Sequence, residues 1–245
     1  MILELIKKKI KSFLRYFGWK LVKIKVKPPT TYPHPDTDIQ NIECIIKASG
    51  ILHIGGHRGT EAGVYNWFKK KVLWIEALPE IFLELNDHVN SFYNQKAICA
   101  LLGDRNKEKQ SFHIANNDGA TSSLFDFSKD VKKKKLWSDR NFKMIKKLSL
   151  DMVTLDSLLE KLNIQAKDYN HWILDVQGAE LLVLKGAKKS LINCRSLQVE
   201  VSKVEFYEGG VLWEDLLFFL KEYSFFPTSY PEIDHTEILF LKKNI

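Results

Sequence analysis

Apolar residues follow two different periods along this chain of 245 residues, and the alternation between them predicts its elements. Short runs of apolar residues indicate buried strands at residues 51–54, 72–75, 97–102, 172–176 and 197–201, with further strands expected at 110–115 and 237–241. Apolar residues three and four positions apart predict helices at residues 60–70, 79–89, 153–162, 179–190 and 212–222. Strands that alternate with helices favour an open α/β sheet with helices on both faces.

The first 38 residues have a different pattern. Residues 2–17 combine an apolar face with lysines on the other side, which predicts an amphipathic helix, and residues 21–26 alternate like an extended arm. Four prolines lie in residues 28–38, a composition typical of a linker. The sequence therefore divides into a basic amphipathic segment at 1–27, a proline-rich linker at 28–38 and a main domain at 39–245.

Charge is concentrated in two segments. The whole chain carries a net charge of +7, but residues 1–27 alone carry +8, so the other 218 residues sum to −1. Residues 129–147 carry +7, which leaves the rest of the main domain acidic and predicts a basic loop. A neutral domain with two local basic segments makes nucleic-acid binding an improbable main function.

Several classes of protein are excluded by the composition. No apolar stretch approaches the length of a membrane-spanning helix, and the N-terminal lysines are not followed by the apolar core of a signal peptide. Three widely separated cysteines (Cys44, Cys99, Cys194) indicate reduced thiols and show no metal-ligand spacing. We expect a cytoplasmic protein. Residues 1–27 would either hold it at an anionic inner membrane surface or pack on the main domain or a partner chain. The sequence gives no signal for an oligomeric state.

A glycine-rich turn follows the first predicted strand of the main domain. Gly55, Gly56 and Gly59 join that strand to a helix, so the backbone can approach a ligand closely and present free N–H groups. The spacing is an incomplete dinucleotide fingerprint, and a tight connection without a ligand explains it equally well. Glu76 ends the next strand, 21 residues beyond Gly55, where an acid can bind both hydroxyls of a ribose. The glycine turn and Glu76 together favour a ligand that contains adenosine but no diphosphate.

Three later segments make the pattern more specific. They are residues 116–124 (NNDGATSSL), 155–159 (LDSLL) and 173–180 (ILDVQGAE). With the glycine turn and the acid after the second strand, this series resembles the FkbM-type family of S-adenosylmethionine-dependent methyltransferases over residues 50–245. Each motif is weak alone, whereas five in the right order are specific.

The resemblance implies a class I methyltransferase fold, Rossmann-like and mostly parallel with an antiparallel C-terminal strand. It also implies methyl transfer from S-adenosylmethionine to a hydroxyl, often of a sugar. By position in the motifs, the glycine turn would line the amino-acid end of the cofactor and Glu76 would hold its ribose. Asn117 and Ser122 would border the cofactor or acceptor. The sequence departs from the family at His53, where an acid is usual; we expect His53 to replace it as a cofactor contact. His57 would touch the cofactor or merely cap the turn.

Proton removal from a poorly acidic hydroxyl requires a base. Asp175, at the end of a buried strand, is the first candidate, and Glu200 ends the next strand beside it. The two carboxylates could instead share a divalent metal acting as a Lewis acid, which is not favoured because no third ligand is evident. His235 is a further candidate for the base, and Glu180 is expected to cap its own helix or to bind backbone amides.

The leading prediction is an O-methyltransferase for a carbohydrate hydroxyl in surface polysaccharide biosynthesis. The alternatives are an RNA methyltransferase, supported only by the basic segment at 129–147, and a non-catalytic membrane-associated scaffold, kept open by His53 in place of an acid.

Overall fold

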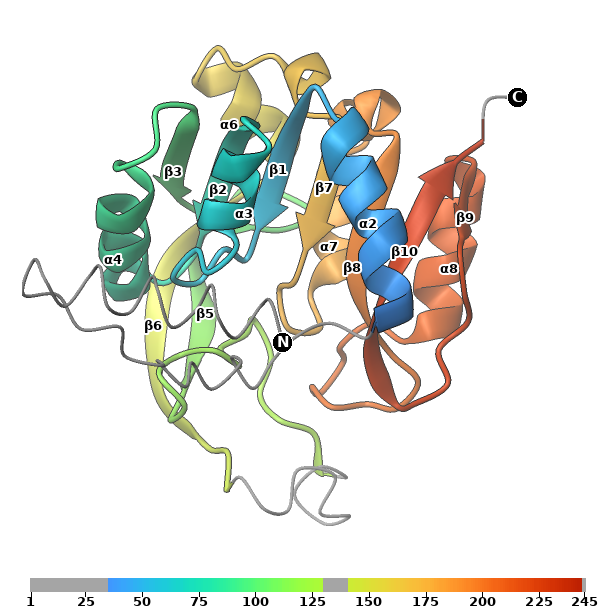
Figure 1. The fold of residues 1–245 in the computed structure, drawn as a ribbon. Coiled ribbons are helices and arrows are strands. Elements are labelled where there is room, and N and C mark those ends of the chain that lie inside the picture. The colour runs from blue at the N-terminus through green and yellow to red at the C-terminus, as the bar shows by residue number, and fades with distance from the viewer. Residues whose placement is uncertain (1–34, 130–140, 244–245) are drawn as a thin grey trace, which may run out of the picture. The chain divides into compact units, whose positions relative to one another are not determined.

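The computed structural model describes residues 35–129 and 141–243. In this part of the chain, seven strands form a central sheet in the order β3-β2-β1-β7-β8-β10-β9 (Figure 1). They are β1 Gly50–Ile54, β2 Lys71–Glu76, β3 Gln95–Cys99, β7 His171–Leu174, β8 Ser196–Ser202, β9 Phe225–Pro227 and β10 His235–Lys242. The pairings are parallel except those of β10, which is antiparallel to β8 and to β9. The open, mostly parallel sheet with an antiparallel C-terminal strand is thus confirmed.

The strand order reverses in the middle of the sheet. The chain runs outward from β1 through β2 to β3 and later returns to place β7 on the other side of β1. In open α/β sheets, ligands bind at such a reversal, beyond the carboxyl ends of the strands. The segments that follow β1 and β7 therefore meet where a ligand is expected.

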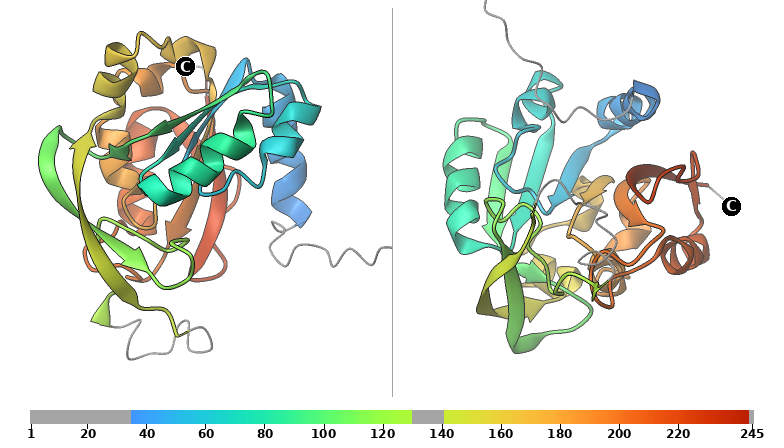
Figure 2. Two further views of the ribbon diagram at one scale, coloured as in Figure 1. Left: turned by 90° about the vertical axis from the view of Figure 1, so that its left-hand side faces the viewer. Right: turned by 90° about the horizontal axis from the view of Figure 1, so that it is seen from below.

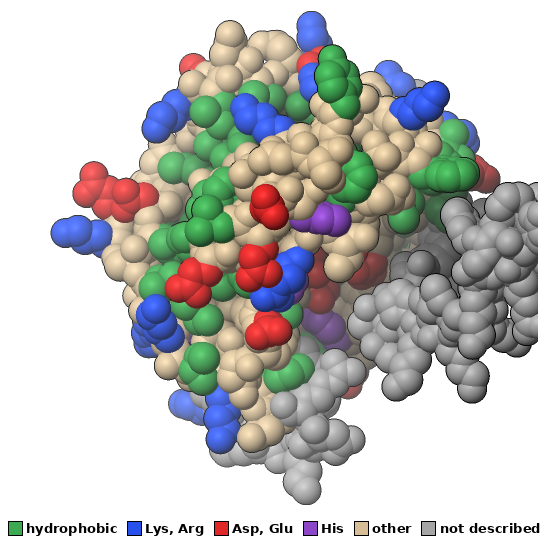
Figure 3. Space-filling view, turned by 60° about the vertical axis from the view of Figure 1, so that its left-hand side comes forward, with side chains coloured by type: hydrophobic (Ala, Val, Ile, Leu, Met, Phe, Trp, Pro, Cys, Tyr) green, Lys and Arg blue, Asp and Glu red, His purple; other side chains and the backbone are tan. Residues whose placement is uncertain are grey.

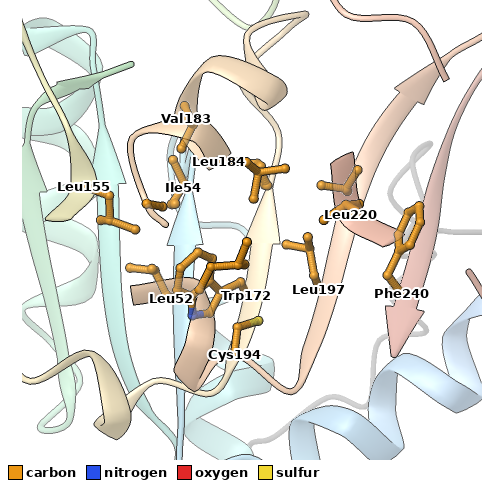
Figure 4. Packing of buried hydrophobic residues seen from close by; sticks show 14 of the residues in the cluster. Leu52, Ile54, Leu155, Trp172, Val183, Leu184, Cys194, Leu197, Leu220 and Phe240 are labelled. Carbon is orange, nitrogen blue, oxygen red and sulfur yellow. The ribbon is translucent and has the colours of Figure 1, made fainter. Parts of the chain in front are cut away.

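Helices cover both faces of the sheet. Successive residues of a strand point to opposite faces, so one strand contributes to the core on each side. Ile51 packs with residues of α2 (Pro35–Lys47), α3 (Ala62–Trp67) and α4 (Pro79–Val89) on one face. Leu52, next in β1, packs on the other face with residues of α6 (Leu155–Lys161), α7 (Glu180–Lys185) and α8 (Trp213–Glu222). This second core includes Trp172 at the centre and Phe240 at the edge (Figure 4).

A second, three-stranded sheet is inserted between β3 and β7. Its order is β4-β6-β5, with β4 Leu101–Leu102, β5 Lys107–Ala115 and β6 Met144–Val153. β5 and β6 extend beyond the carboxyl edge of the central sheet (Figures 1 and 2). The inserted sheet therefore lies beside the edge at which the site is expected.

The sequence prediction was wrong at several boundaries. The expected strand at 97–102 divides at Ala100 between the two sheets, because Ala100 N donates to Glu76 O and the next residues pair with β6. Residues 144–147, predicted as part of a basic loop, belong to β6, where pairing with β5 outweighs their low apolar content. α2 includes residues 35–38, which the composition had assigned to the linker. α7 ends at Lys185, and residues 190–193 form a separate 3₁₀ turn.

Other predicted features lie outside the described residues. These are the amphipathic helix at 2–17, the extended arm at 21–26 and the lysine run at 132–135. In the part of the chain that is described, no helix has both the length and the apolar character needed to cross a membrane.

Candidate active site

The glycine turn lies against the end of β7. Gly55 has a φ of +83°, and a Cβ added there would lie 1.7 Å from the carbonyl oxygen of Asp175. The amides of Gly55 and Gly56 donate to Ile75 O at 2.9 and 3.1 Å, which attaches the turn to β2 as well. Only glycine can occupy position 55. Its close contact with the backbone of Asp175 places the glycine turn and Asp175 at the same edge of the sheet.

Gly56 and Gly59 are required by the packing of the turn. A Cβ on Gly56 would lie 2.8 Å from the Trp74 ring, and a Cβ on Gly59 would lie 2.7 Å from the Leu85 side chain. The turn can therefore lie flat on β2 and α4. Gly56 and Gly59 are themselves buried, and the amides of Gly55, Gly56 and Gly59 all donate within the fold, so the free N–H groups predicted for this turn are not found at these three residues.

Glu76 connects the two turns that follow β1 and β2. Its Oε2 accepts a hydrogen bond from His57 N at 2.9 Å, and its Oε1 accepts one from Leu78 N at 2.8 Å. Burial raises the pKa of Glu76, while the two amide donors act in the opposite direction. Each carboxylate oxygen has a second lone pair, so the same oxygens can still accept from ribose hydroxyls.

The loop at residues 116–123 meets the glycine turn through His57. The imidazole Nε2 of His57 lies 3.1 Å from Asp118 O. Asn117 Oδ1 accepts from the hydroxyl of Thr121 at 3.0 Å, and Ser122 Oγ accepts from Ala115 N at 3.1 Å. The side chains of Asn117 and Ser122 thus hold the loop in shape. The cofactor segments predicted from sequence are brought together, with these two side chains engaged inside the loop.

His53 is not placed as the sequence analysis expected. Its ring stacks on Trp74 at a centroid distance of 4.4 Å, and its Nδ1 lies 3.2 Å from the Tyr65 hydroxyl. Burial lowers the pKa of His53, so the imidazole is neutral. A neutral ring enclosed by two aromatic side chains is a poor partner for the charged end of a cofactor. The position of His53 therefore does not support the expected contact with the cofactor.

The three predicted catalytic residues lie in one hydrogen-bonded group. Gln177 Nε2 donates to Asp175 Oδ1 at 2.5 Å and to Glu200 Oε2 at 2.9 Å. His235 Nε2 lies 2.7 Å from Glu200 Oε1, and its Nδ1 lies 2.7 Å from the hydroxyl of Ser202. Asp175 follows β7, Glu200 belongs to β8 and His235 begins β10, so three neighbouring strands contribute to the group.

The electrostatics of this group favour protons on the carboxyls. Burial and the neighbouring Glu200 raise the pKa of Asp175 well above its usual range. Burial and the charge of Glu180 raise the pKa of Glu200 to about 8. Burial lowers the pKa of His235, although the nearby carboxylates oppose this effect. A carboxylate with a raised pKa is a stronger base once ionised, as proton removal from a hydroxyl requires.

Glu180 closes the turn between β7 and α7, as the sequence suggested. Its Oε1 accepts from Val176 N and from Gly178 N, both at 3.1 Å. Burial raises the pKa of Glu180 to about 7, with the charge of Asp175 adding to the shift. The residue therefore serves the turn and also adds a negative charge next to the catalytic candidates.

A shared metal ion has limited support from this geometry. Within residues 35–129 and 141–243, no group of three or more His, Cys, Asp and Glu side chains is arranged to hold one. The amide nitrogen of Gln177 occupies the position between Asp175 and Glu200 that a bridging cation would take. In this structure the two acids are joined by an amide, and the metal role considered for them stays a prediction.

Two residues of the group were missed by sequence reasoning. Gln177 belongs to the quoted segment 173–180, yet nothing in the sequence shows that its amide reaches two strands. The hydroxyl of Tyr207 donates to Gln177 Oε1, and no sequence signal points to this residue.

On the face shown in Figure 3, acidic and histidine side chains lie in a hollow of the surface.

The strand order and the site at its carboxyl edge define the class I fold of S-adenosylmethionine-dependent methyltransferases. Residues 53–227 match the model of the methyltransferase FkbM domain, and the chain belongs to this family. The chain is similar to the 2-O-methyltransferase NoeI of Sinorhizobium fredii, with 26% identity over 163 residues, which cover 65% of each protein. The match thus spans slightly less than two thirds of that relative's length.

Solved structures of other methyltransferases are similar at low identity. TehB from Haemophilus influenzae aligns with 89% of this chain and 65% of its own, with a TM-score of 0.49 and 10% identity. A TehB-like S-adenosylmethionine-dependent methyltransferase from Corynebacterium glutamicum aligns with 98% of this chain and 97% of its own, with a TM-score of 0.41 and 10% identity.

Proposed function

We propose that this methyltransferase transfers a methyl group to a hydroxyl of a sugar or glycan in surface polysaccharide biosynthesis. The observation that best supports this proposal is that Gln177 joins Asp175 and Glu200 beside the glycine turn. The similarity to a 2-O-methyltransferase supports oxygen as the methyl acceptor.

The chain's residues fit S-adenosylmethionine at this edge of the sheet. The turn at Gly55 and Gly56 would line the amino-acid end, with His57 beside it, and Glu76 would accept hydrogen bonds from the ribose. When bound, the sulfonium supplies an electrophilic methyl group. The fit rests on Glu76, whose carboxylate is fixed at the end of β2 by the His57 and Leu78 amides.

In this proposal Asp175 removes the proton from the acceptor hydroxyl. Its carboxylate is held by the Gln177 amide, and its raised pKa gives it more affinity for a proton than a surface aspartate has. His235 orients Glu200 from the opposite side. A base that is fixed before the acceptor arrives loses little free energy to reorganisation at the moment of methyl transfer.

The test is Asp175→Asn, assayed by transfer of labelled methyl groups from S-adenosylmethionine to a panel of oligosaccharides. We expect kcat to fall about 100-fold or more, while calorimetry shows unchanged cofactor affinity. Asp87→Asn, at an exposed position of α4, is the matched control and should leave both values unchanged.

Several outcomes would contradict the proposal. Unchanged transfer by Asp175→Asn would remove this residue as the base. Methyl transfer to an RNA oligonucleotide and to none of the oligosaccharides would replace the carbohydrate acceptor. Absence of cofactor binding would leave the non-catalytic alternative.

We also propose that residues 1–27 bring the enzyme to an anionic inner membrane surface, since they carry a net charge of +8. The division into a basic segment at 1–27, a linker and a main domain is part of this proposal, with the linker ending before Pro35, where α2 begins. Deletion of residues 1–27 should abolish co-sedimentation with vesicles that contain phosphatidylglycerol and leave cofactor affinity intact. Equal sedimentation of both forms would contradict it.

A further inference from the structure

Gln177 occupies an unusual backbone position directly after β7. Its φ is +56°, a left-handed conformation that residues other than glycine rarely adopt. Gly178, with a φ of +93°, continues the turn. The backbone oxygen of Gln177 accepts from the Ser123 hydroxyl at 2.6 Å. The turn is thus fixed from the main chain, independently of the Gln177 side chain.

The side-chain amide of Gln177 uses both of its hydrogens on carboxylates. Nε2 carries two hydrogens, and it lies 2.5 Å from Asp175 Oδ1 and 2.9 Å from Glu200 Oε2. One acceptor follows β7 and the other belongs to the neighbouring strand β8, so the amide spans two adjacent strands. One uncharged donor therefore connects two acids that would otherwise repel each other.

Tyr207 fixes which end of the amide faces the acids. Its hydroxyl donates to Gln177 Oε1, so the oxygen of the amide points to Tyr207 and the nitrogen points to the carboxylates. Tyr207 is 2% exposed, and its ring packs on Phe127 at a centroid distance of 5.5 Å. A Cβ on Gly178 would lie 3.0 Å from the Tyr207 ring, so the turn and the ring are in direct contact.

We propose that Gln177, oriented by Tyr207, is a positioning residue that holds the carboxyls of Asp175 and Glu200 together as one proton-sharing pair. The catalytic base is then the pair, which holds one proton and accepts a second from the acceptor hydroxyl. This inference rests on the proposed function for its role in turnover. The pairing itself concerns only residues of this chain and can be measured without an acceptor.

The surroundings of the pair explain why a neutral donor is suited to this place. Glu180 from α7 and Glu237 from β10 add negative charge, and His235 contacts Glu200 from β10. A lysine or arginine at 177 would neutralise the acids and lower their affinity for a proton. The amide of glutamine orders the carboxylates and leaves their charge in place, so the base keeps its strength.

The direction of the effect follows from which form the amide stabilises. Gln177 donates to the ionised carboxylates, so loss of the donor disfavours ionisation and moves the titration of the pair to higher pH. A hydrogen bond to a charged group corresponds to a shift of about one pH unit or more. Gln177→Leu removes both donors at similar volume.

The experiment is a ¹³C carboxyl NMR titration of the full chain, with the Asp175 and Glu200 signals assigned by Asp175→Asn and Glu200→Gln. Gln177→Leu should raise the lower midpoint of the pair by about one unit or more. Tyr207→Phe should shift the same midpoint upward by a smaller amount. Gln95→Leu is the matched control, because Gln95 is also buried but bonds Trp74 and Ala62 O, and it should leave the midpoint unchanged.

Kinetics give a second readout that a purely structural role would not move. The acidic limb of the pH profile of kcat should shift to higher pH in Gln177→Leu, by the same amount as the NMR midpoint. Activity should then recover at high pH, whereas Asp175→Asn should stay inactive at every pH. The KM for S-adenosylmethionine should not change.

Independent midpoints for Asp175 and Glu200, or an unchanged midpoint in folded Gln177→Leu, would overturn the proposal. If Gln177→Leu fails to fold, the titration of Tyr207→Phe decides, and an unchanged midpoint there overturns it. Failure of the proposed function appears differently, as a shifted titration in a protein that methylates none of the oligosaccharides.

Discussion

Acid should destabilise this protein through one buried histidine of the central sheet. His171 begins β7 and is 0% exposed, with its Nδ1 2.8 Å from the hydroxyl of Ser196. Burial and the neighbouring His53 lower the pKa of His171 to about 4. The folded protein therefore holds this imidazole in its neutral form over most of the accessible pH range.

The size of the effect follows from proton linkage. In the unfolded chain the pKa of a histidine is about 6.5, so between pH 6.5 and 4 the unfolded state binds the proton and the folded state does not. Stability from this residue is fully present above pH 6.5 and is lost as the pH falls. At pH 5 the loss is about 2 kcal/mol, and its limit below pH 4 is about 3 kcal/mol.

The assay compares the wild type with His171→Gln by urea unfolding at pH 7.5 and pH 5.0. Glutamine keeps a polar group near Ser196 but does not titrate. Buried acids such as Glu200 contribute equally to both proteins, so they cancel in the difference between them. We expect the advantage of the wild type over His171→Gln to shrink by about 2 kcal/mol at the lower pH. His88→Gln, at an exposed position of α4, is the control.

A constant difference in unfolding free energy at both pH values would refute this reasoning. It would mean that His171 is protonated in the folded state, and that the polar atoms around it compensate the charge. A larger change for His88→Gln than for His171→Gln would equally contradict the assignment of the effect to burial.

Two further predictions concern the glycine turn and the ribose site. Gly56→Ala should destabilise the fold by about 1–3 kcal/mol in urea unfolding, because its Cβ would meet Trp74 at 2.8 Å. Gly63→Ala, in α3 with no atom within 4 Å, should instead stabilise by up to about 1 kcal/mol, and equal effects would exclude the packing explanation. Glu76→Gln should raise the Kd for S-adenosylmethionine about tenfold in calorimetry, since a hydrogen-bonding charge is lost. Glu84→Gln, exposed on α4, should not, and an unchanged Kd in both would remove Glu76 from the site.

The edge of the sheet at which the site lies could be predicted from the sequence. Gly55, Glu76 and Asp175 each follow a buried apolar run, and parallel strands end at the same edge of a sheet. The observed pairings of β1 with β2 and β7 place them together. Strand ends are predictable in this way because the hydrophobic pattern marks each strand independently of its neighbours.

Contacts between side chains could not be predicted by the same reasoning. Gln177 bonds Glu200, 23 positions later, and Tyr207, 30 positions later, and no sequence period relates these residues. His53 was assigned to the ligand because of its position in a motif. In the structure its side chain faces α3. Side chains along β1 alternate between the two faces of the sheet, and which face each one takes is known only once the strand is paired with its neighbours.

The inserted sheet was missed for a different reason. β6 contains Lys146 and Lys147, so its apolar residues do not form a continuous run. Its partner β5 supplies the pattern that the sequence alone lacks, with Phe112 opposite Leu148 and Gln110 opposite Leu150. A strand stabilised mainly by its neighbour is weakly marked in its own sequence.

The two strands that bound the inserted sheet lie side by side, with Leu101 paired to Met152 and Leu102 to Val153. The chain therefore leaves the central fold and re-enters it at nearly the same point. Residues between these points that do not contact the site can be lengthened, shortened or exchanged in evolution with little effect on the seven-stranded sheet, whereas Ser123 and Phe127 are constrained by their contacts with Gln177 and Tyr207. Exchange of the unconstrained residues between related proteins offers a practical way to vary the surface beside the site while these contacts are kept.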